Sequence, residues 1–389
     1  AKALARRGHA IGFATVVPPS ERALSGLPLE LGLHSLASDG RGQGTASIGA
    51  DSDKPPLTRL QRRFLRYWGV DPSWLRATGS LVRQVGPDVV VSANLELLPL
   101  LAAVDGPTRV WYPADEYARH HLTQWKPWSL PTWKHLFQAA VAAVYERAFA
   151  PCYDRAWVVS SEEAWAMRRI GKARAVDVAP NGVDAEYFQP RDEAKVSRSC
   201  VFWGRLDSGP NVDAVTWFCR RVWPRVKQQI PDASLSLYGF SPTQAVLDLE
   251  RFGVRVVADA PDLRGEVSRH EVAIMPFVSG GGIKNKLLEA AALGLPIVAT
   301  PRACQGLNFQ GGPPLVQVKR PREWVAALLA LWRDAGLRDR LGRAARSWVV
   351  EKHTWDAAAR NVLAGLNGLS SPVRPSPMPM VEVSSCPSN

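Results

Sequence analysis

Hydrophobic positions along the chain alternate between two patterns. Short runs of consecutive apolar residues, typical of strands buried on both faces, are followed by stretches with apolar residues at helical spacing. The run Val272–Phe277 is one example, and Lys284–Leu293 after it has the helical spacing. Comparable runs lie at residues 88–94, 108–113, 156–160, 175–179, 200–204 and 234–240. The alternation predicts an α/β protein built on parallel sheets.

A loop of three glycines separates that example strand from its helix. The loop contains Gly280, Gly281 and Gly282. Because glycine lets the backbone turn sharply, successive N–H groups and the positive end of the next helix can face one anion. We expect this anion to be a phosphate.

Two charged residues of the predicted helix are candidates for binding a nucleotide. Lys286 and Glu289 are three positions apart and share a helix face. The ammonium would meet phosphate oxygens, and the carboxylate, which only accepts hydrogen bonds, suits the two hydroxyls of a ribose. The alternative is a solvated salt bridge between the two, worth ~0.2–0.5 kcal/mol.

Residues 286–300 resemble the donor-site helix and strand of family-4 retaining glycosyltransferases. Their sequence is Lys-Leu-Leu-Glu-Ala-Ala-Ala-Leu-Gly-Leu-Pro-Ile-Val-Ala-Thr. Gly-Ile-x-Asn-Lys at residues 282–286 is similar to the branch of bacterial polysaccharide transferases. The resemblance implies that donor binding involves Gly280, Gly281, Gly282, Ile283, Lys286 and Glu289. The family has two glutamates at this site, and this chain has Gly281 at the position of one of them. Only the role of the other, binding of the donor ribose, therefore carries over, to Glu289.

A Gly-Arg-Leu turn after the run at residues 200–204 extends the resemblance. In the family this arginine contacts the donor diphosphate, which implies that role for Arg205. A second basic residue usually follows six positions later, but Asn211 stands here, in a Pro-Asn-Val-Asp string similar to exosortase-associated sugar transferases. We therefore assign the second phosphate contact to Lys286 and take Arg205 and Lys286 as catalytic candidates. The alternative for Arg205 is a surface ion pair.

The resemblance covers both halves of the chain. It includes Ser-Ser-Glu-Glu at residues 160–163, where Ser161 is expected to cap a helix, Pro-Asn-Gly-Val-Asp at 180–184, and the segment 353–363. It implies two facing Rossmann-like domains, the GT-B-type glycosyltransferase fold, with a C-terminal helix crossing back to the first domain. We expect an acceptor-side domain at 1–190, a donor-binding domain at 191–352, the crossover helix at 353–368 and a disordered tail at 369–389. The chain begins in mid-motif, so we expect one strand and one loop to precede it.

The acceptor-side candidates follow a predicted strand, at the sheet edge where α/β proteins bind ligands. Asp115 or Glu116 could orient or deprotonate an acceptor hydroxyl, with Asp115 as a further catalytic candidate, and Arg119, His120 or His121 could meet an anionic group. The alternatives are a helix cap for the acids and solvated histidines.

The formal charge of +12 implies an anionic partner: a nucleotide sugar, an acidic membrane surface or nucleic acid. A helical stripe of Arg59, Arg62, Arg63 and Arg66 lies beside Leu60, Phe64, Tyr67 and Trp68. Such a helix can lie on an anionic bilayer, or it can pack its apolar stripe on the sheet. The charge is spread over both halves without an aromatic-basic ribonucleoprotein motif, so nucleic-acid binding is disfavoured.

The five cysteines are far apart and lack Cys-x-x-Cys spacing, which favours a reducing cytoplasm and predicts neither metal nor cofactor. The sequence contains no run of 18 apolar residues, so it predicts no membrane span. Together with the resemblance, these features predict a hexosyltransferase that transfers a sugar with retention from a nucleotide-diphosphate sugar to a glycan or lipid-linked acceptor. The setting would be bacterial envelope or exopolysaccharide synthesis, in the cytoplasm or at the inner face of the plasma membrane. A nucleotide-sugar 2-epimerase is the alternative.

Overall fold

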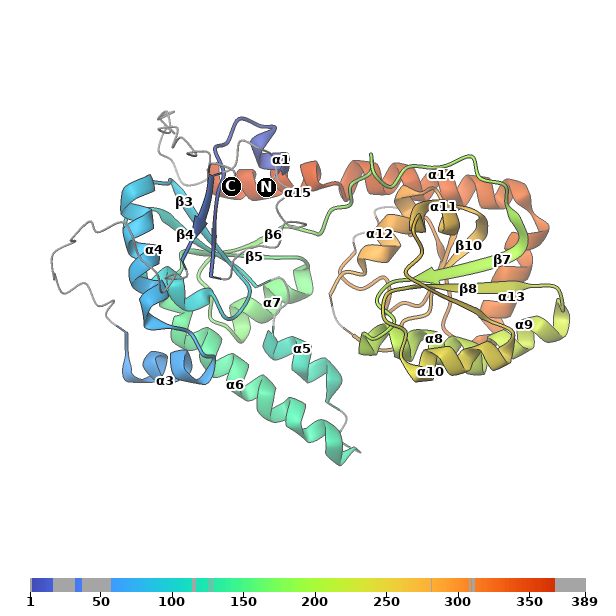
Figure 1. The fold of residues 1–389 in the computed structure, drawn as a ribbon, viewed down its shortest axis with the longest axis horizontal. Coiled ribbons are helices and arrows are strands. Elements are labelled where there is room, and N and C mark those ends of the chain that lie inside the picture. The colour runs from blue at the N-terminus through green and yellow to red at the C-terminus, as the bar shows by residue number, and fades with distance from the viewer. Residues whose placement is uncertain are drawn as a thin grey trace, which may run out of the picture.

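The computed structural model describes residues 2–16, 32–36, 57–113, 117–125, 127, 129–280, 282–307, 309 and 312–367. Within these residues the chain forms two α/β units that lie side by side (Figure 1). The predictions for Asp115, Glu116, Gly281 and the tail at 369–389 lie outside the described residues.

The first unit contains a parallel sheet with the strand order β3-β4-β5-β6. Its strands are β3 (Val89–Ala93), β4 (Thr108–Tyr112), β5 (Arg155–Val158) and β6 (Val176–Val178), and β1 (Gly12–Thr15) pairs separately with β2 (Gly32–Ser35). The helices are α1 (Lys2–Ala5), α3 (Arg59–Tyr67), α4 (Pro72–Val85), α5 (Tyr117–Gln124), α6 (Trp133–Phe149) and α7 (Ser161–Arg169). Buried aromatic residues fill the space between sheet and helices: Trp111, Tyr145, Phe149 and Tyr153.

The second unit contains a six-stranded parallel sheet with the order β12-β11-β10-β7-β8-β9. Its strands are β7 (Val196–Trp203), β8 (Ser234–Gly239), β9 (Arg255–Ala258), β10 (His270–Met275), β11 (Ile297–Ala299) and β12 (Val316–Gln317). Its helices are α8 (Gly209–Arg221), α9 (Trp223–Gln229), α10 (Gln244–Leu247), α11 (Leu263–Ser268), α12 (Asn285–Ala292), α13 (Pro321–Arg333) and α14 (Ala335–Lys352). The strand order reverses between β7 and β10, and open α/β sheets bind ligands at such a point. The loops after these two strands are therefore where we look for the site.

The chain passes between the units twice, and the two passes run side by side. The amide of Val183 donates to the carbonyl of His353 at 2.7 Å, and Val183 forms a parallel bridge with Thr354. Gly182 lies so close to the second pass that a Cβ there would be 2.6 Å from the carbonyl carbon of Thr354 and 2.7 Å from Cα of Trp355. The crossing therefore requires glycine at this position.

After the crossing, α15 (Trp355–Asn367) returns to the first unit, where it packs against α1 and β6 (Figure 1). Its Val362 is buried in a cluster with Val110 and Trp157 of the first sheet. Arg346 of α14 holds the other pass, since its guanidinium donates to the carbonyl of Ala185 at 2.9 Å and to that of Phe188 at 2.6 Å. The same guanidinium donates to Ala292 at the end of α12, so the linker is fixed to the second unit.

Candidate functional site

The turn after β7 and the loop after β10 meet around Lys286. Gly204 has φ of +140°, and a Cβ there would lie 2.7 Å from Cε and 2.8 Å from Nζ of Lys286. A side chain at residue 204 would therefore occupy the place of the ammonium group. The Gly-Arg-Leu turn and the helix α12, which are far apart in the sequence, thus form one site.

Lys286 places its ammonium group in a partly apolar environment. Nζ donates to Oδ1 of Asn211 at 3.1 Å and lies over the rings of Phe202 and Phe277, 5.5 and 5.4 Å from their centroids. Burial lowers the pKa of Lys286 to about 8, and the charge of Glu289 opposes that shift in part. A ligand anion next to Nζ would stabilise the charged form, so the site is suited to an anion.

Asn211 connects the two loops. Its Nδ2 donates to the carbonyl of Arg205 at 2.7 Å while its Oδ1 accepts from Lys286, and its side chain is buried in the first turn of α8. The position where the resembling family carries a basic residue thus holds the turn and Lys286 together. This role could not be read from the sequence, because it depends on the spatial meeting of two loops.

Glu289 is positioned by an indole. Its Oε2 accepts from Nε1 of the buried Trp203 at 2.7 Å, while Oε1 accepts no hydrogen bond from the described residues. Lys286 and Glu289, both within the described part of the chain, do not form a salt bridge with each other. The solvated salt bridge considered for this pair is therefore not what the structure contains.

Arg205 lies at the surface and is paired. Its side chain is 71% exposed and forms a bidentate pair with Asp207, Nε to Oδ1 at 3.1 Å and Nη2 to Oδ2 at 2.8 Å. This hydrogen-bonded pair raises the pKa of Arg205 and lowers that of Asp207. Solvent screens such an exposed pair and leaves it weak, so a more highly charged anion could take the place of Asp207.

The described glycines of the loop after β10 have backbone conformations that favour glycine, with φ of +84° at Gly280 and +69° at Gly282. A Cβ on Gly280 would lie 2.9 Å from Pro210, so this loop packs against the start of α8. Ile283 is buried, and its Cγ1 would lie 3.2 Å from a Cβ on Gly306. The buried side chain of Ile283 anchors the loop, so the backbone of the loop stays available to a ligand.

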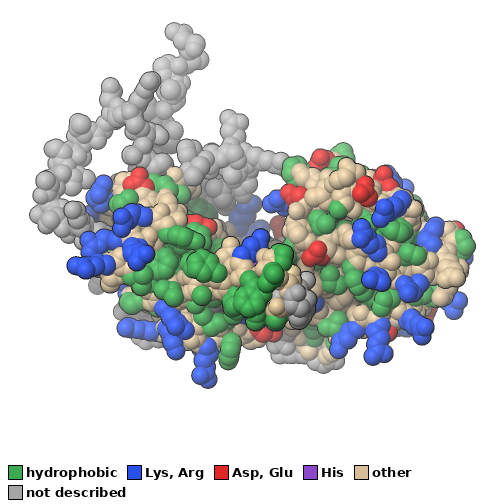
Figure 2. All heavy atoms as spheres, turned by 90° about the horizontal axis from the view of Figure 1, so that it is seen from below, with side chains coloured by type: hydrophobic (Ala, Val, Ile, Leu, Met, Phe, Trp, Pro, Cys, Tyr) green, Lys and Arg blue, Asp and Glu red, His purple; other side chains and the backbone are tan. Residues whose placement is uncertain are grey.

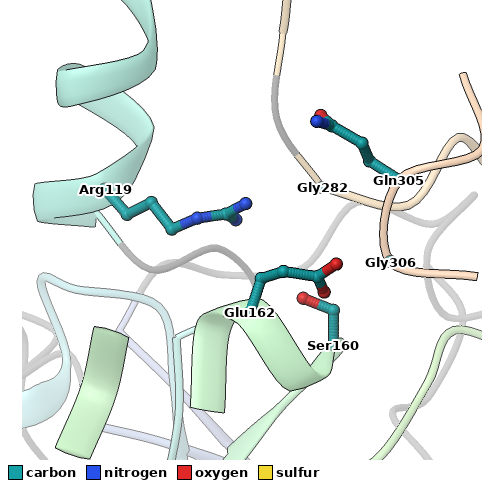
Figure 3. A pocket seen from close by; sticks show the side chains of 6 residues that line it. All are labelled: Arg119, Ser160, Glu162, Gly282, Gln305 and Gly306. Carbon is teal, nitrogen blue, oxygen red and sulfur yellow. The ribbon is translucent and has the colours of Figure 1, made fainter. Parts of the chain in front are cut away.

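A hollow between the two units opens next to this loop (Figure 3). Arg119, Ser160 and Glu162 line it from the first unit, and Gly282, Gln305 and Gly306 line it from the second. An adjoining hollow of about 370 Å³ is lined by Arg119, Ser161, Glu162 and Trp165. Nδ2 of Asn181 also donates to Oδ1 of Asn285 at 3.0 Å across the units. The start of α12 therefore faces polar groups of the first unit.

Of the acceptor-side candidates, Arg119 reaches this hollow (Figure 3). His121 instead stacks on His135, with ring centroids 5.7 Å apart and the two Nδ1 atoms 3.4 Å apart. The side chain of His120 lies outside the described residues. His121 is thus part of a contact between α5 and α6.

The helix α7 corrects one expectation and supplies a residue that we did not predict. Ser160, not Ser161, is the N-cap, because its Oγ accepts from the amide of Glu163 at 3.2 Å. Glu162 in the first turn faces the hollow. It follows a strand directly, as Asp115 does, so the same sequence argument would have found it. Gln305 has no comparable signal, since it lies in a loop.

The arginines of α3 are exposed, but its apolar residues differ from the expected stripe. Phe64 and Leu65 are buried, whereas the side chains of Leu60 and Tyr67 are 43% and 63% exposed. Gln61 takes an inner position instead, where Nε2 donates to the carbonyl of Ala148 at 2.8 Å. The stripe Arg59, Arg62, Arg63 and Arg66 therefore lies in solvent beside two exposed apolar side chains.

Within the described residues, no group of three or more His, Cys, Asp or Glu side chains could hold a metal ion. In the same part of the chain, no helix combines the length and the hydropathy needed to cross a bilayer.

Comparison with known proteins finds a family match in the second unit. Residues 197–334 match the family model described as glycosyl transferases group 1. The loops around Lys286 both lie inside these matched residues. No curated protein sequence matches the chain.

Solved structures with the same fold cover nearly the whole chain. Sucrose-phosphate synthase from Thermosynechococcus elongatus has a TM-score of 0.64 at 16% identity, covering 94% of this chain and 90% of that one. A glycosyltransferase from Rickettsia africae has a TM-score of 0.63 at 11% identity, covering 95% and 92%. Anabaena HepE in complex with UDP and glucose has a TM-score of 0.59 at 13% identity, covering 92% and 91%. The predicted fold of two Rossmann-like domains, the GT-B type, is confirmed.

Proposed function

We propose that this chain is a retaining glycosyltransferase of the hexosyltransferase type that moves a sugar from a nucleotide-diphosphate sugar to an acceptor hydroxyl. The observation that carries the proposal is the half-buried ammonium of Lys286, placed between the loops after β7 and β10 within the residues that match the glycosyl transferases group 1 model. The structure named HepE in complex with UDP and glucose has the same fold, which supports a nucleotide diphosphate sugar as the donor.

Each donor-side group has a proposed role. Lys286 and the amides of the glycine loop bind the diphosphate, and Arg205 exchanges its bond with Asp207 for a phosphate oxygen. Glu289, which Trp203 holds by one oxygen, uses the other to accept from the ribose. As the bond to the sugar breaks, negative charge grows on the leaving diphosphate, and fixed cations stabilise this charge.

The small hollow between the units and the larger one adjoining it are together the proposed site for the transferred sugar and the acceptor. Arg119, Glu162 and Gln305 converge on the hollow between the units (Figure 3). Hydroxyl groups of a glycan can donate to the carboxylate, and an anionic acceptor group can accept from the guanidinium. We propose a glycan or lipid-linked acceptor of bacterial envelope or exopolysaccharide synthesis. We further propose that the reaction needs no metal, which activity in excess chelator would test.

Incubation with a panel of nucleotide sugars and glycan acceptors tests the function. Transfer is expected, with release of the nucleoside diphosphate and an anomeric proton coupling equal to that of the donor. An epimerised donor without transfer would instead identify a nucleotide-sugar 2-epimerase. Inversion at the anomeric carbon would contradict the retaining mechanism.

Glu289→Gln is expected to weaken binding of the nucleoside diphosphate by roughly tenfold, since one hydrogen bond to a charged group contributes ~1.5–3 kcal/mol. The fold should remain, because an amide oxygen can still accept from Trp203. Calorimetric titration measures the affinity, and thermal melting is the control. The ribose role is wrong if the affinity stays at the wild-type value.

Nucleotide affinity is expected to fall with pH above about 8, the pKa that burial gives Lys286. Below this pH the lysine is already charged, and the affinity should be level. Above it, binding must draw a proton onto Nζ, so affinity falls by up to ~tenfold per pH unit. Titrations with UDP across this range check the slope. If the slope of affinity against pH is the same in Lys286→Met, a group other than Lys286 causes the pH dependence.

A further inference from the structure

The helix α6 is apolar on two opposite faces. Its inner face is buried in the first unit and comprises Ala139, Ala142, Tyr145 and Phe149. Its outer face carries a second apolar stripe at helical spacing, formed by Trp133, Phe137, Ala140 and Val144. The exposed fractions are 67% for Phe137, 47% for Trp133 and 45% for Val144. A surface helix ordinarily presents polar residues outward, so this outer stripe indicates a partner.

Neighbouring segments extend the stripe. Leu130, just before α6, is 83% exposed, and Leu122 of α5 is 40% exposed. We call Leu122, Leu130, Trp133, Phe137 and Val144 the hairpin face. In Figure 2 hydrophobic side chains gather on the underside of the first unit, where α3, α5 and α6 lie, and Lys and Arg side chains border them.

The exposed acidic and basic side chains on α3, α5 and α6 have one sign. The exposed side chains of Arg59, Arg62, Arg63 and Arg66 on α3 and of Lys134 on α6 are cationic. In the sequences of α3, α5 and α6 the sole acidic residue is Glu146, which is buried. A second copy of the chain would bring cationic borders against each other, whereas an anionic lipid surface complements both the charge and the apolar centre.

We propose that α3 and the α5–α6 hairpin dock on an anionic lipid bilayer. Trp133 and Phe137 enter the interface between headgroups and acyl chains, where aromatic side chains are favoured, and the arginines of α3 contact lipid phosphates.

The docking surface and the hollow between the units share the helix α5. Arg119, which lines the hollow, stands on the same short helix as Leu122 of the hairpin face. This part of the inference rests on the proposed function: a lipid-linked acceptor in the docked bilayer would approach the hollow along α5.

Flotation of the full chain with vesicles tests the docking. The protein is expected to float with phosphatidylcholine vesicles that contain phosphatidylglycerol, not with phosphatidylcholine alone, and less at high salt. Trp133→Ser with Phe137→Ser should weaken the partition by roughly tenfold or more. Phe240→Ser, at a side chain 60% exposed in the second unit, is the matched control and should have no effect.

The cationic border has its own variants. Arg59, Arg62, Arg63 and Arg66 changed together to Gln should reduce the partition by more than tenfold, at roughly one order of magnitude or less per charge. For a control matched in lost charge, the pair Arg62→Gln with Arg63→Gln is compared with Arg220→Gln with Arg221→Gln, which is exposed on α8. Equal reduction by the two pairs would show that only net charge matters and would overturn the docking surface.

A fluorescent probe locates the contact. The cysteines at 152, 200, 219 and 304 are buried, so an environment-sensitive dye on Phe137→Cys in a Cys386→Ser background reports one position. Its emission should shift to the blue on anionic vesicles, whereas the dye on Phe240→Cys should not respond. Equal responses, or a lipid-free dimer in sedimentation velocity that Trp133→Ser with Phe137→Ser dissociates, would contradict the proposal. These binding assays contain no sugar donor and measure docking alone, so a failure of docking is distinguished from a failure of sugar transfer.

Discussion

Lys286→Met is expected to lower kcat by roughly 10- to 100-fold, because it removes a charge-assisted hydrogen bond worth ~1.5–3 kcal/mol from the leaving diphosphate. Methionine retains most of the side-chain volume next to Phe202 and Phe277, so the loss is that of the charge. The fall in kcat should exceed the loss of nucleotide affinity, since the diphosphate gains charge as the sugar departs. Initial rates at saturating donor measure it.

Stability separates this catalytic role from a structural one. Burial lowers the pKa of Lys286 from 10.5 to about 8, so below pH 8 the folded protein holds an ammonium where burial disfavours it. The unfolded chain binds this proton more tightly, and the free energy of unfolding therefore rises as the pH increases from about 8 to 10.5. At neutral pH Lys286→Met should keep the wild-type Tm or raise it.

Lys284→Met is the matched control, because this lysine precedes α12 and also lies over the ring of Phe277, 5.4 Å from its centroid. It should retain most of the turnover. The assignment of Lys286 is wrong if Lys286→Met has full turnover at saturating donor, or if the two variants lose activity equally.

Gly182→Ala is expected to destabilise the protein by about 2–4 kcal/mol. The new Cβ would meet the backbone of Thr354 and Trp355, 2.6 Å from the carbonyl carbon of Thr354, and backbone cannot rotate away as a side chain can. Relief requires the two passes between the units to separate, which breaks the bond from Val183 to His353. Urea unfolding measures the change.

Gly209→Ala is the control for this variant, since a Cβ there meets nothing within 4 Å. It should change the free energy of unfolding by less than about 0.5 kcal/mol. If both variants unfold at the same urea concentration as the wild type, the crossing does not need glycine and the tight packing at this point is not a source of stability.

The sequence predicts the elements of the fold well because their signals are local. Consecutive apolar residues specify β10, helical spacing specifies α12, and the glycines between them specify the turn. The meeting of the turn at Gly204 with Lys286 follows from these signals, since both residues come after central strands of one parallel sheet. The caps are less exact, as the change from Ser161 to Ser160 shows.

Contacts between distant segments are what the sequence does not specify. The hydrogen bond from Trp203 to Glu289 depends on how a strand and a helix are placed in space, and the position of Glu162 opposite Gln305 depends on how the two units are placed. The outer stripe of α6 was missed for another reason. A helix that is apolar on both faces has no polar side from which to infer its orientation, so burial alone distinguishes Phe137 from Phe149.

The return of α15 to the first unit has a consequence for how the chain could be divided. A polypeptide cut between residues 190 and 191 would give a first fragment that lacks the helix covering β6, and a second fragment that carries this helix at its far end. Val362 of the second fragment would then still be able to pack on the apolar surface that the cut exposes around Val110 and Trp157 of the first fragment. The two fragments, expressed separately, are expected to recombine without a covalent link, which would make the protein a natural scaffold for a split enzyme.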